Sequence, residues 1–514
     1  MIAKKDKTEK ISQATQVLEL IESEIALFHD LKKNAYAMIK INDKIVNLSI
    51  ESRKFSDWIS HIYWISYNKA LNNNVLRDCL GTLRAKAYFE SPCHSIFIRI
   101  GFHENSIYLD LANEHGQFVE INADGWKLII NPPIKFISID SMRPLPIPKQ
   151  GGDFNTLFTF INIPKKSQKL VMAWMLDCFI PNTPYPLLVL HGLQGSAKST
   201  TQEFLRELID PSESNLRGAP KKSEDLMVAA VNNYMISLNN ISYLSPQQQD
   251  DLCCVSTGGG YSTRKLYTTS QEQTVDIKRP VILNGINEIV TAQDLIDRSI
   301  IIELPSISEE YRKTELEIKE NFNNEKPKIL GGMLDALVSV LQKLPHVRLA
   351  KKPRMADFAN LGVALEKTLN WEADSFMQAY SSHQMEAKIA ALEHCPIIMA
   401  VVEYVEEQGV YEGSYGHLYQ KLTDRYKSRN SGWPQSAKGL AEAIKRQLPA
   451  LRVLDIEVTF SSIRKKDGYH VLLKKVFENK VHHVHQVHSS NTNRFGDPSE
   501  SRYVPSKYIP KFIR

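Results

Sequence analysis

The sequence predicts an α/β protein whose central domain is a mainly parallel sheet covered by helices on both faces. Three observations lead to this class. Four short apolar runs, typical of buried strands, alternate with helical segments in the middle of the chain. One of these runs leads into a glycine-rich loop and then a helix. An α+β pattern precedes this region, and three helices followed by a strand pair come after it.

The bulk composition narrows the class of protein. A chain of 514 residues is too long for one ordinary core, so several domains are expected. Its net charge of +5 is small, so any nucleic-acid-binding surface must be local. Six cysteines without a CxxC pair argue against disulfides or a zinc site. With no secretory signal and no apolar run long enough to cross a bilayer, the sequence predicts a cytoplasmic protein without membrane contact.

Composition shifts divide the chain into expected domains. Residues 1–142 read as an N-terminal α+β domain with DNA binding or oligomerisation as candidate roles. A proline- and glycine-rich stretch predicts a linker at 143–155. The α/β core follows at 156–310, with a helical lid at 311–390, a winged helix at 391–476 and a disordered tail at 477–514.

Within these domains the pattern places individual elements. The core strands are expected at Leu187–His191, Tyr234–Asn239, Val281–Asn284 and Ser299–Leu304. The lid helices are expected at Ile329–Leu344 and Asp357–Leu369. Helical spacing covers residues 1–32, and strand-like runs begin at Ala35–Val46. The winged helix combines helices near Ile397–Glu407, Tyr415–Tyr426 and Ser436–Gln447 with strands at Leu451–Phe460 and Tyr469–Val476.

The strongest motif is a phosphate-binding loop between the first core strand and the following helix. Glycines let such a loop wrap closely, so that backbone N–H groups and the helix N-terminus point at phosphate oxygens. Lys198 would neutralise the β- and γ-phosphates of ATP, and the Ser199 hydroxyl would ligate Mg²⁺. Alanine replaces the usual glycine at position 197, which is tolerable if φ stays negative there. The expected nucleotide-binding residues are Gly192, Gly195, Ser196, Ala197, Lys198, Ser199 and Thr200.

Hydrolysis also needs an acid at the end of a neighbouring strand to hold Mg²⁺. The expected strand ends in Asn239 and Asn240 instead. Asparagine has the shape of aspartate without its charge, so ATP binding is predicted more firmly than ATP hydrolysis. Asn284, at the end of the next strand, is placed to sense the γ-phosphate or its attacking water.

Two arginines are candidates for contacts with the γ-phosphate. Arg298 precedes the last core strand, where it could act as an arginine finger on a neighbouring subunit's ATP. The alternative for Arg298 is a helix-terminal salt bridge with Asp294 or Asp297. Arg354 opens a lid helix and could contact the γ-phosphate within its own subunit.

The order of these motifs resembles the P-loop helicases of the AAA+ and superfamily 3 type that prophages and integrative mobile elements carry. The stretches that carry the resemblance are PYPLLVLHGLQGSAKST, TGGGYSTRKLYT, RPVILNGI and DLIDRSI. The resemblance implies a hexameric ring with ATP and Mg²⁺ at subunit interfaces and single-stranded DNA in the central channel. It also implies a pore hairpin between Gly258 and Lys278, in which Arg264, Lys265 and Lys278 would contact the DNA backbone. In that family the position of Asn239 is usually aspartate.

The C-terminal domain adds a second candidate DNA-binding surface. Ser436 is expected to cap a basic helix, and the following hairpin has a basic tip. A basic helix and a basic wing are how winged helices grip duplex DNA, although the same fold also mediates protein contacts. The candidate residues are Lys438, Lys445, Arg446, Arg464, Lys465 and Lys466. The tract 481–488, VHHVHQVH, reads as disordered in preference to a metal site.

The sequence therefore predicts an ATP-dependent DNA helicase of a mobile element, acting as a ring. A nucleotide-gated DNA-binding scaffold or replication initiator, with little hydrolysis because of Asn239, is the alternative. An AAA+ protein-remodelling factor is disfavoured because the expected pore hairpin is basic, although Tyr261 and Tyr267 fit such a factor.

Overall fold

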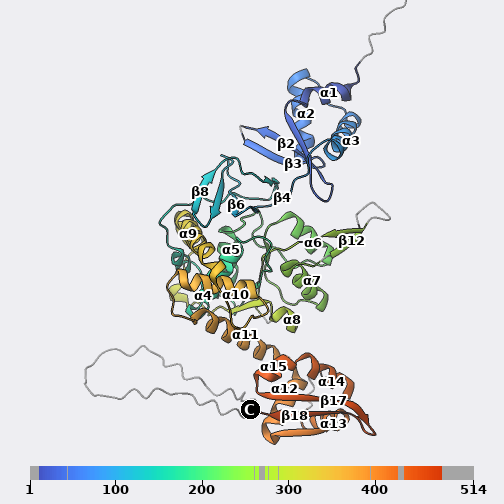
Figure 1. Ribbon diagram of the computed structural model, residues 1–514, viewed down its shortest axis with the longest axis vertical. Coiled ribbons are helices and arrows are strands. Elements are labelled where there is room, and N and C mark those ends of the chain that lie inside the picture. The colour runs from blue at the N-terminus through green and yellow to red at the C-terminus, as the bar shows by residue number, and fades with distance from the viewer. Residues whose placement is uncertain are drawn as a thin grey trace, which may run out of the picture.

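The computed structural model describes residues 11–42, 44–259, 261–264, 272–275, 277–286, 289–393, 395–426 and 433–476. The molecule is elongated, with an N-terminal unit at one end, a central sheet domain and a C-terminal domain at the other end (Figure 1). The His-rich tract at 481–488 and the predicted tail lie outside the described residues. Along the described part of the chain, no helix is both long and apolar enough to span a bilayer.

The N-terminal unit, residues 11–94, packs three helices against an antiparallel sheet of order β1-β2-β3 around its own core. The helical prediction for residues 1–32 is wrong beyond Ile21, because Ile25–His29 pairs with β2 as a strand. The single run predicted at 35–46 is instead a hairpin. The elements are α1 (Gln13–Ile21), β1 (Ile25–His29), β2 (Ala35–Ile41), β3 (Lys44–Ser49), α2 (Arg53–Tyr67) and α3 (Asn73–Phe89).

A four-stranded antiparallel sheet follows, which we call the β-meander. Its buried residues Leu109, Val119 and Ile121 belong to the same core as the central sheet domain. The predicted domain end at residue 142 is therefore wrong, because the core is continuous across it. The meander strands are β5 (Ile100–His103), β6 (Ser106–Asp110), β7 (Phe118–Asn122) and β8 (Gly125–Ile129), and a small parallel pair joins β4 (Ile96–Phe97) to β9 (Lys135–Phe136).

The predicted linker at 143–155 is also packed. The Lys149 N–H donates to the carbonyl of Pro327 at 2.9 Å, on the long helix α9 (Glu315–Lys343). A Cβ on Gly331 would lie 1.7 Å from the Lys149 carbonyl oxygen, so only glycine lets the two backbones approach this closely. The proline-rich segment is an extended strap along α9.

The central sheet is parallel, as predicted, with strand order β11-β14-β10-β15. Its side chains alternate between two cores: Leu188 and Leu190 face one side, and Leu187 and Val189 the other. The strands are β10 (Leu187–His191), β11 (Ile236–Leu238), β14 (Val281–Gly285) and β15 (Ser299–Glu303).

Helices cover both faces of this sheet. The face of Leu188 shares its core with α4 (Lys165–Asp177), α5 (Lys198–Glu207), α9, α10 (Ala356–Thr368) and α11 (Ser375–Glu393). The face of Leu187 is covered by α6 (Ser223–Asn232), α7 (Pro246–Thr257) and α8 (Gln293–Ile296). Helix α9 is longer than predicted, and three short 3₁₀ turns complete the domain at Phe154–Thr159, Glu309–Tyr311 and Leu344–His346.

A short antiparallel hairpin, β12 (Tyr261–Arg264) and β13 (Glu272–Val275), projects from the body of the molecule near α6 (Figure 1). The C-terminal domain has its own core and a sheet of order β16-β18-β17. The strand predicted to begin at Leu451 is wrong there, because Leu448–Val453 is helical. Its elements are α12 (Pro396–Gln408), β16 (Val410–Ser414), α13 (Tyr415–Tyr426), α14 (Ala437–Arg446), α15 (Leu448–Val453), β17 (Ile456–Lys465) and β18 (Gly468–Lys475).

Candidate nucleotide-binding site

The phosphate loop, residues 192–197, lies at the carboxyl edge of the parallel sheet. It follows β10, which pairs with β14 on one side and β15 on the other. Helix α5 begins directly after the loop at Lys198, so its free N–H groups open toward the same edge. The carboxyl edge of an open parallel sheet is where such folds place ligands, and a helix N-terminus there favours an anion.

Backbone conformation explains the glycines of the loop. Gly192 has φ +149°, and a Cβ there would lie 2.6 Å from the Leu304 carbonyl oxygen. Gly195 has φ +79°. Ala197 also adopts the left-handed region, with φ 56° and ψ 32°, so the negative φ that would make alanine tolerable here is not present. An alanine in this region is strained by its Cβ, which shows why glycine is the usual residue here.

Lys198 lies over the loop. Its ammonium donates to the carbonyls of Gly192 and Leu193, both at 2.8 Å. It forms no ion pair with a carboxylate among the described residues. Partial burial lowers the pKa of Lys198. A phosphate group would replace carbonyl acceptors with charged ones, which bind an ammonium more strongly.

A network of amide side chains joins α5 to the ends of β11 and β14. The Ser199 hydroxyl donates to Asn239 Oδ1 at 2.9 Å, and Asn284 Nδ2 donates to the same oxygen at 2.7 Å. The buried Asn284 amide also donates to Gln202 Oε1 at 2.6 Å, and its own Oδ1 accepts from the Asn240 N–H at 2.8 Å. The predicted residues Ser199, Asn239, Asn240 and Asn284 therefore lie together.

This geometry tests whether Mg²⁺ would fit. The Ser199 hydroxyl and Asn239 Oδ1 are oxygen ligands of the kind that Mg²⁺ accepts directly or through water. Neither carries a charge, and the described residues hold no cluster of three or more acidic, histidine or cysteine side chains that could hold a metal. A metal here would rely on the phosphates for its negative ligands.

The sequence prediction missed two side chains that clamp the phosphate loop. Asn162, before α4, donates from Nδ2 to the carbonyls of Ser196 at 3.0 Å and Pro305 at 2.7 Å. Arg312 lies against the loop, with Nη2 3.0 Å from the place of a Cβ on Gly195. Arg312 pairs with no carboxylate among the described residues. No motif marks either residue, because each reaches the loop only through the tertiary fold.

Thr200 lies in the first turn of α5, as the loop motif requires. The next residue, Thr201, is fully buried, and its hydroxyl accepts from the Asn162 N–H at 3.3 Å. Ser196 is fully buried as well, and its hydroxyl donates to the Leu193 carbonyl at 2.8 Å. The loop and the first turn of α5 therefore form one fixed unit.

The two candidate arginines lie at the opposite, amino edge of the sheet. The Arg298 carbonyl accepts from the N–H of Leu187, the first residue of β10. Arg298 pairs with Asp294 at 2.9 Å, and Arg354 pairs with the same carboxylate at 3.0 Å. Because β10 separates this edge from the phosphate loop, the prediction that Arg354 contacts phosphate in its own subunit is wrong. For Arg298 the salt-bridge alternative holds within the single chain.

The candidate pore residues lie at different places on the hairpin. Arg264 ends β12, Lys265 lies outside the described residues, and so does the side chain of Arg264. Lys278 lies at the base of the hairpin, where its ammonium donates to the Asn182 carbonyl at 3.0 Å. Lys278 is therefore held against the sheet domain in this conformation.

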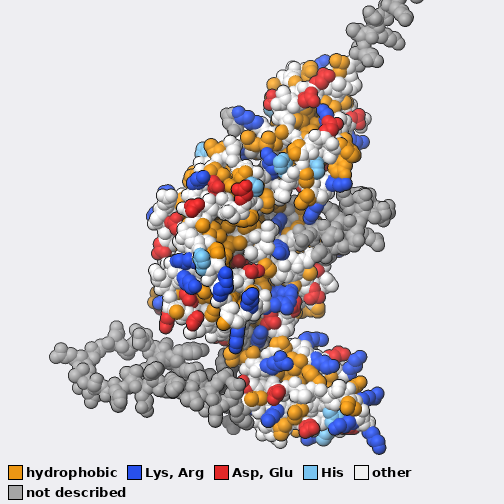
Figure 2. Space-filling model, in the orientation of Figure 1, with side chains coloured by type: hydrophobic (Ala, Val, Ile, Leu, Met, Phe, Trp, Pro, Cys, Tyr) orange, Lys and Arg blue, Asp and Glu red, His pale blue; other side chains and the backbone are white. Residues whose placement is uncertain are grey.

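The candidate DNA-binding residues of the C-terminal domain are all exposed. Ser436 caps α14 by accepting from the Gly439 N–H, as predicted. Figure 2 shows Lys and Arg side chains spread over the visible face of this domain. The residues are Lys438, Lys445 and Arg446 on α14, Arg464 and Lys465 at the end of β17, and Lys466 in the turn to β18.

Known proteins were compared with the chain in three ways. No curated protein matches its sequence. Among solved structures, three apo structures of the C-terminal region of NrS-1 align with 90–91% of this chain and 100% of theirs, at 12–13% identity. Their TM-scores of 0.37 to 0.40 are too low to carry an argument about fold or activity.

Two protein-family models match the chain. Residues 154–383 match the actinomycete integrative conjugative element replication protein, and residues 397–478 match the C-terminal domain of the same replication protein. The two matches follow one another in the expected order and together span more than half of the chain. The predicted origin in a mobile element and role in DNA replication are thereby confirmed, and the chain belongs to the family of integrative conjugative element replication proteins.

Proposed function

We propose that this replication protein is an ATP-binding motor of the AAA+ type that acts on DNA as a helicase. The observation that carries the proposal is the carboxyl edge of the sheet, where the phosphate loop, the α5 N-terminus and Asn284 converge. Lys198 and Arg312 are cations beside this loop without carboxylate partners among the described residues. Such an edge favours a polyphosphate anion.

In this proposal each residue has a defined task. Loop N–H groups and Lys198 bind the β- and γ-phosphates, and Ser199 orients Mg²⁺, which neutralises the phosphate charge when bound. Asn284, held by Gln202 and Asn239, orients the attacking water or reports the γ-phosphate. Asn239 keeps the hydrogen bond to Ser199 that an aspartate would make, without its charge.

A ring is proposed because the phosphate loop and the candidate arginines lie at opposite edges of the sheet. Arg298 and Arg354 lie at the amino edge, away from their own phosphate loop. In a ring, one subunit's amino edge can face the next subunit's carboxyl edge. Arg298 would then leave Asp294 to contact phosphate on the neighbour.

Mixing two inactive variants tests this arrangement. Lys198→Ala removes the phosphate contact, and Arg298→Ala removes the finger. If Arg298 acts across the interface, mixed rings contain some sites with both groups intact, so ATPase activity returns on mixing. Activity that stays absent in mixtures, from variants that still co-assemble, would contradict a finger in trans.

DNA binding is proposed at the C-terminal domain. Its element order, with α14 followed by the β17–β18 hairpin, supports a winged helix. Replacing Arg464, Lys465 and Lys466 with alanine should weaken duplex binding and reduce its salt dependence, because each phosphate contact releases counterions. The control is Lys367→Ala, an exposed lysine on α10. Equal duplex affinity in the triple variant and the parent would remove the wing from the interface.

Asn239 supports a second candidate function, a nucleotide-gated DNA-binding initiator with little turnover. Here ATP would hold the ring closed on DNA and would not drive translocation. Phosphate release measured on the unaltered chain with DNA separates the two functions. DNA-stimulated release together with strand separation supports the motor, whereas tight ATP-dependent DNA binding without release supports the initiator.

A further inference from the structure

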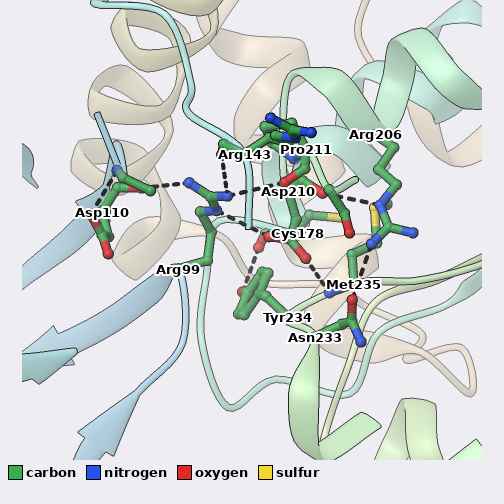
Figure 3. A network of polar contacts seen from close by, with 12 residues as sticks. Arg99, Asp110, Arg143, Cys178, Arg206, Asp210, Pro211, Asn233, Tyr234 and Met235 are labelled. Carbon is green, nitrogen blue, oxygen red and sulfur yellow. Dashed lines mark hydrogen bonds and ion pairs between the residues drawn. The ribbon is translucent and has the colours of Figure 1, made fainter. Parts of the chain in front are cut away.

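Arg99 is buried where the β-meander meets the sheet domain, outside the residues that match the replication-protein family. Its side chain has 0% exposure, and its backbone lies in the left-handed region with φ 59°. A buried guanidinium needs a carboxylate and partners for its remaining N–H groups. Arg99 has a carboxylate and at least one acceptor for each of its three nitrogens, and Figure 3 shows how these partners surround it.

The carboxylate is Asp210. Arg99 Nε donates to Asp210 Oδ1 at 3.0 Å, and Asp210 is itself almost completely buried. The other guanidinium nitrogens donate to three backbone carbonyls: Asp110 at 2.9 Å, Arg143 at 2.7 Å and Pro211 at 3.2 Å. Arg99 therefore connects the meander, the strap along α9 and the segment after α5.

Asp210 in turn fixes two elements of the sheet domain. Its Oδ2 accepts from the N–H of Met235, directly before β11, at 3.0 Å. Its backbone carbonyl accepts from Arg206 Nε at 3.0 Å, in the last turn of α5. Arg206 also donates to Asn233 Oδ1 at 3.3 Å. Asp210 thus contacts the end of α5 through its backbone carbonyl and the start of β11 through its carboxylate, and it holds the two together.

These two elements carry the two halves of the candidate nucleotide site at their other ends. Helix α5 begins with Lys198 and Ser199, and Lys198 lies about 12 Å along the helix from Arg206 in the last turn, at 1.5 Å per residue. Strand β11 leads into Asn239, whose oxygen accepts from Ser199 at 2.9 Å. That contact depends on how α5 and β11 lie relative to one another. Asp210 fixes their relative position at the ends that lie away from the phosphate loop.

We propose that Arg99 is a positioning residue for the nucleotide site, acting through Asp210 on the placement of α5 and β11. The proposal rests on the proposed nucleotide-binding function. It makes the β-meander part of the nucleotide-binding unit, although the family match begins only at residue 154. A displacement of about 1 Å at such a site can lower the rate on the order of 100-fold. The position that Arg99 gives to α5 and β11 should therefore affect activity.

The test compares Arg99→Met and Arg99→Lys with Trp126→Phe in the full chain. Methionine removes every donor, and lysine keeps a charge beside Asp210 while losing the planar fork. The control removes another bond between meander and sheet domain, from Trp126 Nε1 to Asp335 Oδ1 at 2.7 Å, which reaches α9 and not α5. Affinity for a fluorescent ATP analogue and hydrogen exchange without nucleotide are measured for each variant.

Arg99→Met should weaken nucleotide binding about 3- to 30-fold, the range of coupling through packed networks, and speed amide exchange in α5 and β11. Arg99→Lys should do the same to a smaller extent. Trp126→Phe should speed exchange in β8 and α9 and change affinity by less than about twofold.

Unchanged affinity and unchanged α5 exchange in a folded Arg99→Met chain would overturn the proposal. If that variant does not fold, the same two measurements on Arg99→Lys decide the question, and unchanged values there overturn it equally. Hydrogen exchange needs no nucleotide, so it decides the positioning role even if the parent chain binds no ATP. In that case the proposed function alone has failed.

Discussion

The two edges of the parallel sheet differ in how their charges are satisfied. At the amino edge both candidate arginines are paired with an acid, because Arg298 and Arg354 share Asp294. At the carboxyl edge Lys198 and Arg312 pair with no carboxylate in the described part of the chain, and their neighbours are amides and backbone carbonyls. The two edges therefore differ in pairing: the arginines of the amino edge share a carboxylate within the single chain, whereas Lys198 and Arg312 have none among the described residues.

This difference separates groups that are ready to bind an anion from groups that must first be released. A polyphosphate entering the carboxyl edge displaces no internal ion pair. An anion approaching the amino edge must compete with Asp294, so a finger role for Arg298 requires that pair to break. Substitutions at the two edges and in the elements around them therefore test this difference in pairing.

Replacing Lys198 with alanine should have the largest effect, because it removes the main cation of the carboxyl edge. We expect ATP affinity to fall about 100-fold, equivalent to roughly 3 kcal/mol for charge-assisted bonds to phosphate. Titration calorimetry measures this loss. Lys367→Ala makes the same change at an exposed position of α10 and should leave affinity unaltered. Equal losses in both variants would show only a general charge effect.

Asn239→Asp should convert the neutral network into a metal-holding one. Asn239 Oδ1 already accepts from Ser199 and Asn284, so a carboxylate oxygen can take both bonds. The second oxygen adds the negative charge that Mg²⁺ prefers, and Mg²⁺-dependent phosphate release should rise about 10- to 100-fold.

The control for that gain is Asn240→Asp, which adds the same charge one residue later, where the side chain is exposed. Its rate should stay within about twofold of the parent. A faster rate in Asn240→Asp than in Asn239→Asp would place the missing metal ligand at residue 240 instead.

Acid should lower the stability of the sheet domain by disturbing strand β15, which lies at one side of the sheet. His383 Nε2 accepts from the Ile301 N–H of β15 at 2.9 Å, which requires a neutral ring. Burial lowers the pKa of His383 to about 4 from its usual 6.5. The unfolded chain binds this proton more readily, so stability is complete above pH 6.5 and is lost progressively as pH falls toward 4.

Between about pH 7.5 and 5.5 the loss from His383 should be roughly 1 to 2 kcal/mol, measured as a shift in the denaturant midpoint. His383→Gln keeps an acceptor for Ile301 and cannot titrate, so its midpoint should change less over the same range. Parallel pH curves for the parent and His383→Gln would assign the acid sensitivity to other groups.

The smallest effect is expected at Ala197. Its φ of 56° strains an alanine, so Ala197→Gly should stabilise the folded domain by about 1 kcal/mol. The matched control, Ala229→Gly within α6, should destabilise by a similar amount because that residue is helical. Destabilisation by both changes would show that the loop strain is relieved elsewhere.

Local patterns predicted the parts of the fold that depend on neighbouring residues. The four core strands, the phosphate loop and the cap at Ser436 each have a spacing or residue type that defines them. The convergence of Ser199, Asn239 and Asn284 followed from parallel strands sharing a carboxyl edge.

The failures have a different cause, since they involve contacts between distant parts of the chain. Arg354 was expected near its own phosphate loop because it opens a lid helix, but Asp294 holds it at the other edge. Asn162 and Arg312 carry no motif and reach the loop only through the tertiary fold. The linker prediction took proline and glycine as signs of a domain boundary, whereas Gly152 lets the strap pack closely on α9.

The shared core of the β-meander also constrains how such genes can recombine. Mobile elements exchange modules, and an exchange leaves a working protein only where the joint cuts few contacts. A joint near residue 154, where the family match begins, would separate Leu109, Val119 and Ile121 from the core they complete. A joint between α3 and β4 would spare that core, so crossovers that replace the N-terminal unit should accumulate around residues 90–95.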